Sequence, residues 1–406
     1  MVRADQKPGR RRAVPEPKPR RSRSDRQDRT GVDARDQQDP HEPATSPAPE
    51  AVPEPPTLIA PQVTPRVQGA PPAEPKRSLA ARLTVRAMKG LWLLTVLAGA
   101  AAVATHWMPD LSVPDVVATA GAVTLTTAYA FGLAARTGGR PLLSGGLALA
   151  LALAAVLSQV PILLAGAAVG TAVLAAVLGV MSTVPAARFV GVVREVLVAV
   201  AVAVVGGFAA EAYEAELSLE RTGYLVLGLS LLCALGLVYR LGAGLHGLGK
   251  RGLVMIVGGV GLLTVTLAYT EALGQWGSPA LIEGIESSVD VVRDTLGAVP
   301  RPIEVLLGFP ALAWGISTRA RRRQGWWVCA FGAAGLAAVT VSMLDPDVSV
   351  LESGLTLLYG VVLGLLLGYV VIRADLFLTG PRGRRARRLE EARAHRPEPG
   401  RMQPLL

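Results

Sequence analysis

Five ionisable residues lie within or at the ends of long apolar segments of this sequence: Arg194, Glu195, Glu211, Glu271 and Glu304. Charged side chains are costly inside a membrane, and those found there mark ion pairs, proton relays or substrate sites. Arg194 can extend toward water while Glu195 pairs with it or with a neighbouring helix. Glu211, Glu271 and Glu304 fall near predicted helix ends, where together they would form a vestibule for a cation or a proton. Solvated separately, they would only oppose membrane insertion of their loops.

The glycine-rich stretch GAGLHGLGKR at residues 242–251 matches two phosphate-binding spacings, G-x-G-x-x-G and G-x-x-x-x-G-K. Such glycines bring backbone amides close to phosphate oxygens when they connect a strand to a helix. Here they follow a long apolar segment, and Arg251 stands where a Ser or Thr would meet magnesium. The stretch is therefore predicted to be a flexible loop with cationic ends, and no cofactor is predicted.

Catalytic and metal-binding patterns are scarce. No HExxH or GxSxG pattern occurs, and Cys233 and Cys329 lie in separate apolar runs. Asp110 and Asp115 fall between the first two apolar segments, a position that resembles that of the catalytic acid in membrane glycosyltransferases. The large outer loops of those enzymes have no counterpart here, so a noncatalytic protein is favoured and an enzyme is the weaker alternative.

The elements that would position these residues are long apolar helices. Of the 406 residues, 51% are hydrophobic and only 5% are aromatic, which is typical of a membrane protein. Apolar runs of about 17 to 25 residues recur, the length of a helix that crosses about 30 Å of hydrocarbon. We therefore predict an all-α polytopic transmembrane bundle with about ten spans, the third and fourth joined by a tight hairpin at SQVP, residues 158–161. The spans are 91–108, 115–135, 141–159, 162–184, 189–210, 222–239, 252–273, 303–318, 325–344 and 353–372.

The charges between the spans predict the orientation. Eleven Lys and Arg residues fall in or beside alternate gaps and only three in the opposite gaps, and such residues favour cytoplasmic loops. The opposite gaps are rich in Asp and Glu. We therefore expect a multi-pass plasma-membrane protein with cytoplasmic N- and C-termini.

Two polar tails flank the membrane domain, which is predicted at 87–376. Residues 1–86 are rich in Pro, Arg and acidic residues and contain few groups able to form a core, so a disordered cytoplasmic tail is expected. Residues 377–406 form a basic cytoplasmic tail. Either tail is a candidate for binding a membrane or cytosolic protein.

The stretch TRARRRQGWW at 318–327 is too short a gap for a nucleic-acid-binding domain, and no nucleic-acid partner is predicted. Its basic residues are expected to contact anionic lipid and hold the turn in the cytosol, and its two tryptophans to join an aromatic belt at the interface. These residues are Arg319, Arg321, Arg322, Arg323, Trp326 and Trp327.

Two further patterns concern packing. Apolar residues at helical spacing near 281–296 predict an amphipathic helix on the outer side, either lying flat on the bilayer or acting as a gate or partner-binding element. Small residues four apart predict ridges where helix backbones approach closely. The ridge residues are Gly166, Gly170, Gly360, Gly364 and Gly368.

Ten spans with both termini inside resemble, in layout only, the drug/metabolite transporter architecture of two inverted five-helix halves. The Ala, Val, Gly and Arg bias beside a basic tail is also similar to uncharacterised polytopic membrane proteins of high-GC Gram-positive bacteria. The first resemblance implies a permease-like transporter of a small solute, with a polar cavity at the membrane midplane. The alternative is a noncatalytic scaffold for cell-envelope assembly, with a dry bundle.

Overall fold

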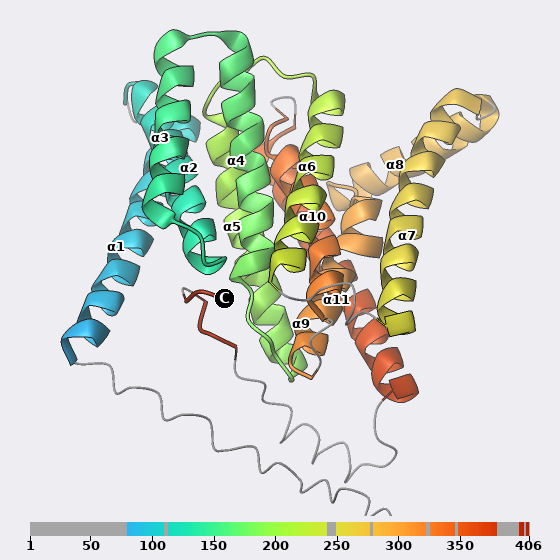
Figure 1. Ribbon diagram of the computed structural model, residues 1–406. Helices are drawn as coiled ribbons and strands as arrows, with labels where there is room; N and C mark the ends of the chain where they lie inside the picture. The colour runs from blue at the N-terminus through green and yellow to red at the C-terminus, as the bar shows by residue number, and fades with distance from the viewer. Residues whose placement is uncertain are drawn as a thin grey trace, which may run out of the picture. The chain divides into compact units, whose positions relative to one another are not determined.

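The helices of the membrane domain are shown in Figure 1. The computed structural model describes residues 79–108, 113–241, 249–276, 279–321, 325–345, 348–379, 398–401 and 403–405. All regular structure in these residues is helical, as predicted. The elements are α1 (Leu79–Ala104), η1 (Thr105–Trp107), α2 (Val116–Arg136), α3 (Pro141–Ser158), α4 (Pro161–Ser182), α5 (Phe189–Glu211), α6 (Leu219–Arg240), α7 (Gly249–Trp276), α8 (Pro279–Leu296), η3 (Glu304–Gly308), α9 (Phe309–Arg319), α10 (Gly325–Ser342) and α11 (Val350–Thr379).

Within the described residues, eight helices are long and apolar enough to cross a membrane: α1 to α6, α10 and α11. By length and composition the chain is a multi-pass integral membrane protein. The remaining two predicted spans correspond to α7 and to η3 with α9. Helix α9 has only 11 residues. Many side chains of α7 lie outside the described residues, and its apolar run among the described residues is Val257–Tyr269.

The boundaries of the two predicted tails shift. Residues 1–78 lie outside the described residues, but α1 begins at Leu79, inside the tail predicted to end at residue 86. At the other end, α11 continues to Thr379. Both helices therefore extend beyond their apolar runs into neighbouring polar sequence.

Proline and backbone conformation explain two local features. Gln159 ends α3 in the left-handed region, with φ of 54°, and Pro161 opens α4, which confirms the predicted hairpin. Pro310 near the start of α9 lacks the N–H that would bond four residues back. The preceding residues, Glu304–Gly308, form a π-helical segment, the local rearrangement expected where a regular helical bond is missing.

Helix α10 lies within the core of the bundle. It is almost completely buried and packs against α9, α6, α4 and α5. The α3–α4 hairpin and α7 lie on opposite sides of it in Figure 1. Many core side chains are small, with Ala168, Ala172, Ala175 and Ala176 of α4 fully buried. Such residues allow helices to approach closely, so that van der Waals contact holds the bundle together in lipid.

Glycines mark the closest helix contacts, and only some were predicted. A methyl group added at Gly364 would lie 2.7 Å from Phe309 Cβ, and one at Gly368 would lie 2.9 Å from Ala313 Cβ, so the predicted ridge on α11 is confirmed. The predicted ridge on α4 is wrong, because nothing lies within 4 Å of a methyl group added at Gly166 or Gly170. Helix α4 packs through its alanine face instead.

The amphipathic helix predicted near 281–296 is present as α8. Its C-terminal end is attached to α11 by an ion pair between Arg293 Nε and Glu352 Oε1 at 3.2 Å, and by a hydrogen bond from Tyr359 to the Leu296 carbonyl at 2.8 Å. Gly297 then ends the helix with φ of 77°. Most of the described side chains of α8 are exposed.

Candidate functional site

Three charged side chains are buried together at one end of the bundle. Arg136 ends α2, Arg319 ends α9, and Glu195 lies in the second turn of α5. Their exposed fractions are 1%, 1% and 0%, so protein rather than lipid or water surrounds them. We call Arg136, Glu195 and Arg319 the charged layer. Burial of charge at this depth is costly unless every charge finds a partner.

Glu195 accepts hydrogen bonds from three directions. Arg194 Nη2 lies 2.9 Å from its Oε1, so the expected adjacent pair is present, and the exposed side chain of Arg194 reaches outward. The Val184 amide donates to Oε2 at 3.0 Å. Arg401 Nη2 donates to both carboxylate oxygens, at 2.9 and 2.7 Å. The carboxylate thus joins α5, the α4–α5 loop and the far C-terminal part of the chain.

Arg319 is fixed by equally specific contacts. Its Nη1 donates to Thr183 Oγ1 at 2.7 Å and its Nη2 to the Thr183 carbonyl at 3.0 Å. Nη2 also forms a 2.7 Å ion pair with Glu398, and the guanidinium lies 3.5 Å above the ring of Trp326. The cation–π contact and the ion pair together stabilise a charge that is out of reach of water.

The lipid-anchor prediction is wrong for three of its residues. Arg319, Trp326 and Trp327 are buried in the protein, where the guanidinium of Arg319 lies against the ring of Trp326 instead of reaching lipid. Arg321 is half-buried. Arg322 and Arg323 lie outside the described residues.

A segment near the C-terminus covers the charged layer. Residues 398–405, of which 402 is not described, lie at the end of the bundle below α2 in Figure 1. We call them the C-terminal segment. Besides the two ion pairs above, the Leu405 amide donates to the Arg136 carbonyl at 2.9 Å. This part of the predicted basic tail at 377–406 is therefore docked on the membrane domain.

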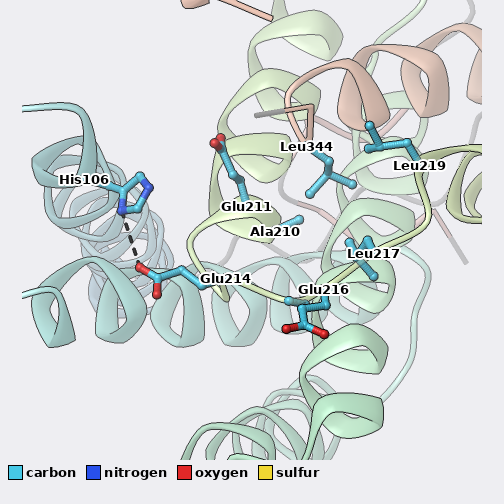
Figure 2. A pocket seen from close by; sticks show the side chains of 9 residues that line it. His106, Ala210, Glu211, Glu214, Glu216, Leu217, Leu219 and Leu344 are labelled. Carbon is cyan, nitrogen blue, oxygen red and sulfur yellow. Dashed lines mark ion pairs between the residues drawn. The ribbon is translucent and has the colours of Figure 1, made fainter. Parts of the chain in front are cut away.

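A second polar region lies at the opposite end of α5. A cavity of about 460 Å³ is lined by residues from η1, α5, the α5–α6 loop, α6 and the end of α10. Figure 2 shows the carboxylate of Glu214 facing His106, with Nδ1 and Oε1 3.8 Å apart, while Glu211 and Glu216 point apart. The described residues hold no group of three or more potential metal ligands, in keeping with these diverging carboxylates.

The structure describes the side chains of only two of the three glutamates in the predicted vestibule. Glu211 lines the 460 Å³ cavity and also a neighbouring one of about 210 Å³. Glu304 is buried elsewhere, in η3, where its Oε2 would lie 2.5 Å from a methyl group added at Gly360. The side chain of Glu271 and the whole of Asp110 lie outside the described residues. Glu211 and Glu304 therefore do not share a described cavity.

A small hydroxyl network links α2, α4 and the turn after α5. Thr126 Oγ1 lies 2.7 Å from Thr171 Oγ1 and 2.8 Å from the Tyr213 hydroxyl. Burial raises the pKa of Tyr213, which keeps its hydroxyl neutral and able to donate. Nothing in the sequence signalled this network, because the three residues are up to 87 positions apart.

Thr126→Val should lower the free energy of unfolding by about 1 kcal/mol, because it leaves two buried hydroxyls short of a partner. Thr124→Val is the matched control, since Thr124 lies two residues away on α2 and its hydroxyl bonds only its own helix, to Ala120. We expect the control to change stability by less than about 0.5 kcal/mol. Reversible SDS titration of both variants measures the difference, and equal effects would contradict a role for the network.

No protein-family model matches this chain, and the comparisons with curated proteins and with solved structures give no match either.

Proposed function

We propose that the protein is a permease-like transporter of a small solute in the plasma membrane. The observation that carries this proposal is the charged layer, whose three buried charges come from three helices yet are covered by a chain segment instead of a helix. Ionisable groups within a membrane bundle are costly, and they commonly mark solute or ion paths. A chain segment of this kind can detach without unfolding the bundle. Such a movement is what would open the buried charges to one side of the membrane.

In this proposal all ten predicted spans cross the membrane. Arg136 and Arg319 meet the same C-terminal segment, so α9 ends where α2 ends. From there α9 and η3 run antiparallel to α10, with Gly315 against Cys329 and Gly308 against Gly335. The end of α8 is attached near the start of α11, which leaves α7 to connect the two ends of the bundle.

The charged layer then faces the cytosol and the cavity around Glu211 faces outward, with both termini inside. Exposed arginines at the inner end, rather than Arg319, supply the contacts with anionic lipid. Among the described residues, the exposed arginines at this end are Arg86, Arg140, Arg188, Arg194, Arg240 and Arg373.

Cysteine labelling in intact cells tests this orientation. Cys233 and Cys329 are first replaced by serine and alanine. An impermeant maleimide should then label Glu220→Cys, at the start of α6, and should leave Arg140→Cys, before α3, unlabelled until the membrane is opened. Both positions are exposed to solvent, so reversed labelling would contradict the orientation.

Transport itself is tested with proteoliposomes on a solid-supported membrane, challenged with a panel of small cations, anions and neutral solutes. We expect at least one class to give a transient current that Glu195→Gln reduces by tenfold or more, on the order of one lost charge-assisted interaction. Glu214→Gln, a carboxylate that is largely exposed at the other end, is the matched control and should keep most of the current. A panel without any current, measured on folded protein, would contradict transport.

The dense core favours a second candidate, a noncatalytic membrane scaffold. Buried side chains around α4 and α10 are mainly small and apolar, and the two described polar cavities lie at the outer end of α5. If the protein is a scaffold, hydroxyl-radical footprinting should detect no water along α4, α5 and α10, whichever solute is added. Capture of a partner protein should then depend on α8 or on the tails.

A further inference from the structure

Arg136 is held by backbone carbonyls rather than by a carboxylate in the described part of the chain. Its Nε donates to the Met181 carbonyl at 3.0 Å, and its Nη1 donates to the carbonyls of Pro399, Gly400 and Gln403 at 3.1, 2.8 and 2.9 Å. Its Nη2 is buried and has no hydrogen-bond partner. A guanidinium presents a planar fork of donors that matches two oxygens of one oxyanion. This fork is only half used.

Arg319 shows the same incomplete use of its donors. Its Nη atoms bond Thr183 and Glu398, but its Nε is buried without a hydrogen-bond partner. The face of Trp326 and the hydroxyl of Thr183 hold the guanidinium plane in place whether or not Glu398 is bound. The position for a negatively charged group is therefore formed by the membrane domain itself.

The charges of the cluster do not balance. Among the described residues, Arg136 lies within electrostatic range of Arg319, Arg401, Glu195 and Glu398, so that three positive groups face two negative ones even before the exposed Arg194 beside Glu195 is counted. The C-terminal segment contributes one charge of each sign, and the membrane domain alone therefore keeps the same positive excess. A buried excess charge favours binding of a counter-charge.

We propose that Arg136 and Arg319 form a binding site for an oxyanion, a phosphate or carboxylate group, and that the C-terminal segment occupies this site as a built-in competitor. The carboxylate of Glu398 and the three carbonyl oxygens stand where the oxygens of the anion would bind. A free anion would also bring to Arg136 the formal charge that carbonyl oxygens lack. The idea that this anion is the transported solute rests on the proposed function, but binding of the anion can be measured without any transport.

Two sources can supply the same chemistry: a soluble phosphate, or the phosphate of an anionic lipid at the membrane surface. Either source should displace the C-terminal segment, because Glu398 and the anion compete for Arg319.

The test uses the full-length chain, free of native cysteines, with a spin label at Pro404→Cys, an exposed position of the C-terminal segment. In phosphatidylcholine nanodiscs, inorganic phosphate should increase the mobile fraction of the label, and chloride at equal ionic strength should not. Glu398→Gln should lower the phosphate concentration at half-effect about tenfold, because the competitor loses its charge. Arg136→Gln should abolish the response.

The lipid source is tested in nanodiscs that contain phosphatidylglycerol. A mobile label there without added phosphate assigns the site to lipid, and a label that responds only to phosphate assigns it to a soluble anion. If neither addition moves the label in folded protein, the proposal is wrong. Arg136→Lys keeps the positive charge but lacks the planar fork of donors, and it is the second variant in case Arg136→Gln does not fold. It should weaken the response to phosphate. An unchanged response in Arg136→Lys would also contradict the proposed site. Release by phosphate without any solute current would refute transport and leave this site standing.

Discussion

Gly308→Val should lower the free energy of unfolding of the membrane domain by about 3 kcal/mol, the upper part of the usual range for overpacking. Gly308 precedes α9 and meets Gly335 of α10 backbone to backbone. An added methyl group would overlap the Gly335 Cα and lie 2.7 Å from its amide nitrogen. Neither backbone can move aside, because α10 is enclosed by α4, α5, α6 and α9. SDS titration or thermal unfolding in nanodiscs measures the loss.

Gly236→Val on α6 is the matched control, since nothing lies within 4 Å of a side chain added there. It should change stability by less than about 0.5 kcal/mol. Gly335→Ala probes the same crossing from the other side, where an added methyl group would lie 2.7 Å from the Gly308 Cα, and should also destabilise. Similar stabilities for Gly308→Val and Gly236→Val would show that the helices are not in backbone contact.

Glu195→Ala should lower the free energy of unfolding by about 3 kcal/mol, the lower end of the range for breaking a buried ion pair. The variant leaves the Val184 amide without its acceptor and removes the partner of Arg401. The exposed side chain of Arg194 can turn to water, which keeps the cost from being larger. The C-terminal segment should also detach, so that carboxypeptidase shortens the variant faster than the parent protein.

The control is Glu214→Ala, a largely exposed carboxylate, which should stay within about 0.5 kcal/mol of the parent. A double-mutant cycle with Arg401→Ala separates the ion pair from the loss of volume. We expect a coupling energy of about 1 to 3 kcal/mol for groups in direct contact. A coupling near zero, with unchanged carboxypeptidase digestion, would mean that the C-terminal segment is not held by Glu195.

The helices were predictable because each depends on a local property. Every apolar run between residues 91 and 372 corresponds to a helix, and the SQVP hairpin and the amphipathic α8 were located correctly. The π-helical segment before Pro310 was not anticipated, although the proline that lacks the donor is visible in the sequence. The spacing and type of residues within one or two helical turns are enough to indicate where such helices and turns form.

The helix contacts were harder to predict, as the glycines show. Gly166 and Gly170 have the same spacing as Gly360 and Gly364, yet only the second pair touches a neighbouring helix. Gly308 and Gly335, which meet backbone to backbone, belong to no regular small-residue pattern in the sequence. Which side of a helix faces protein or lipid depends on its neighbours, and a sequence in which both sides are apolar gives no sign of it.

The sequence alone determined that this is a helical multi-pass membrane protein, because backbone groups in lipid must bond within their own segment and an apolar run of sufficient length has no other solution. Only the tertiary structure decided what its charges do. Arg319 looked like a lipid contact and Arg401 like part of a free tail, but both are bound to partners in the charged layer or the C-terminal segment. Glu195 and Arg401 are 206 positions apart, and the partner of a buried charge is set by how the helices pack, which local spacing does not encode.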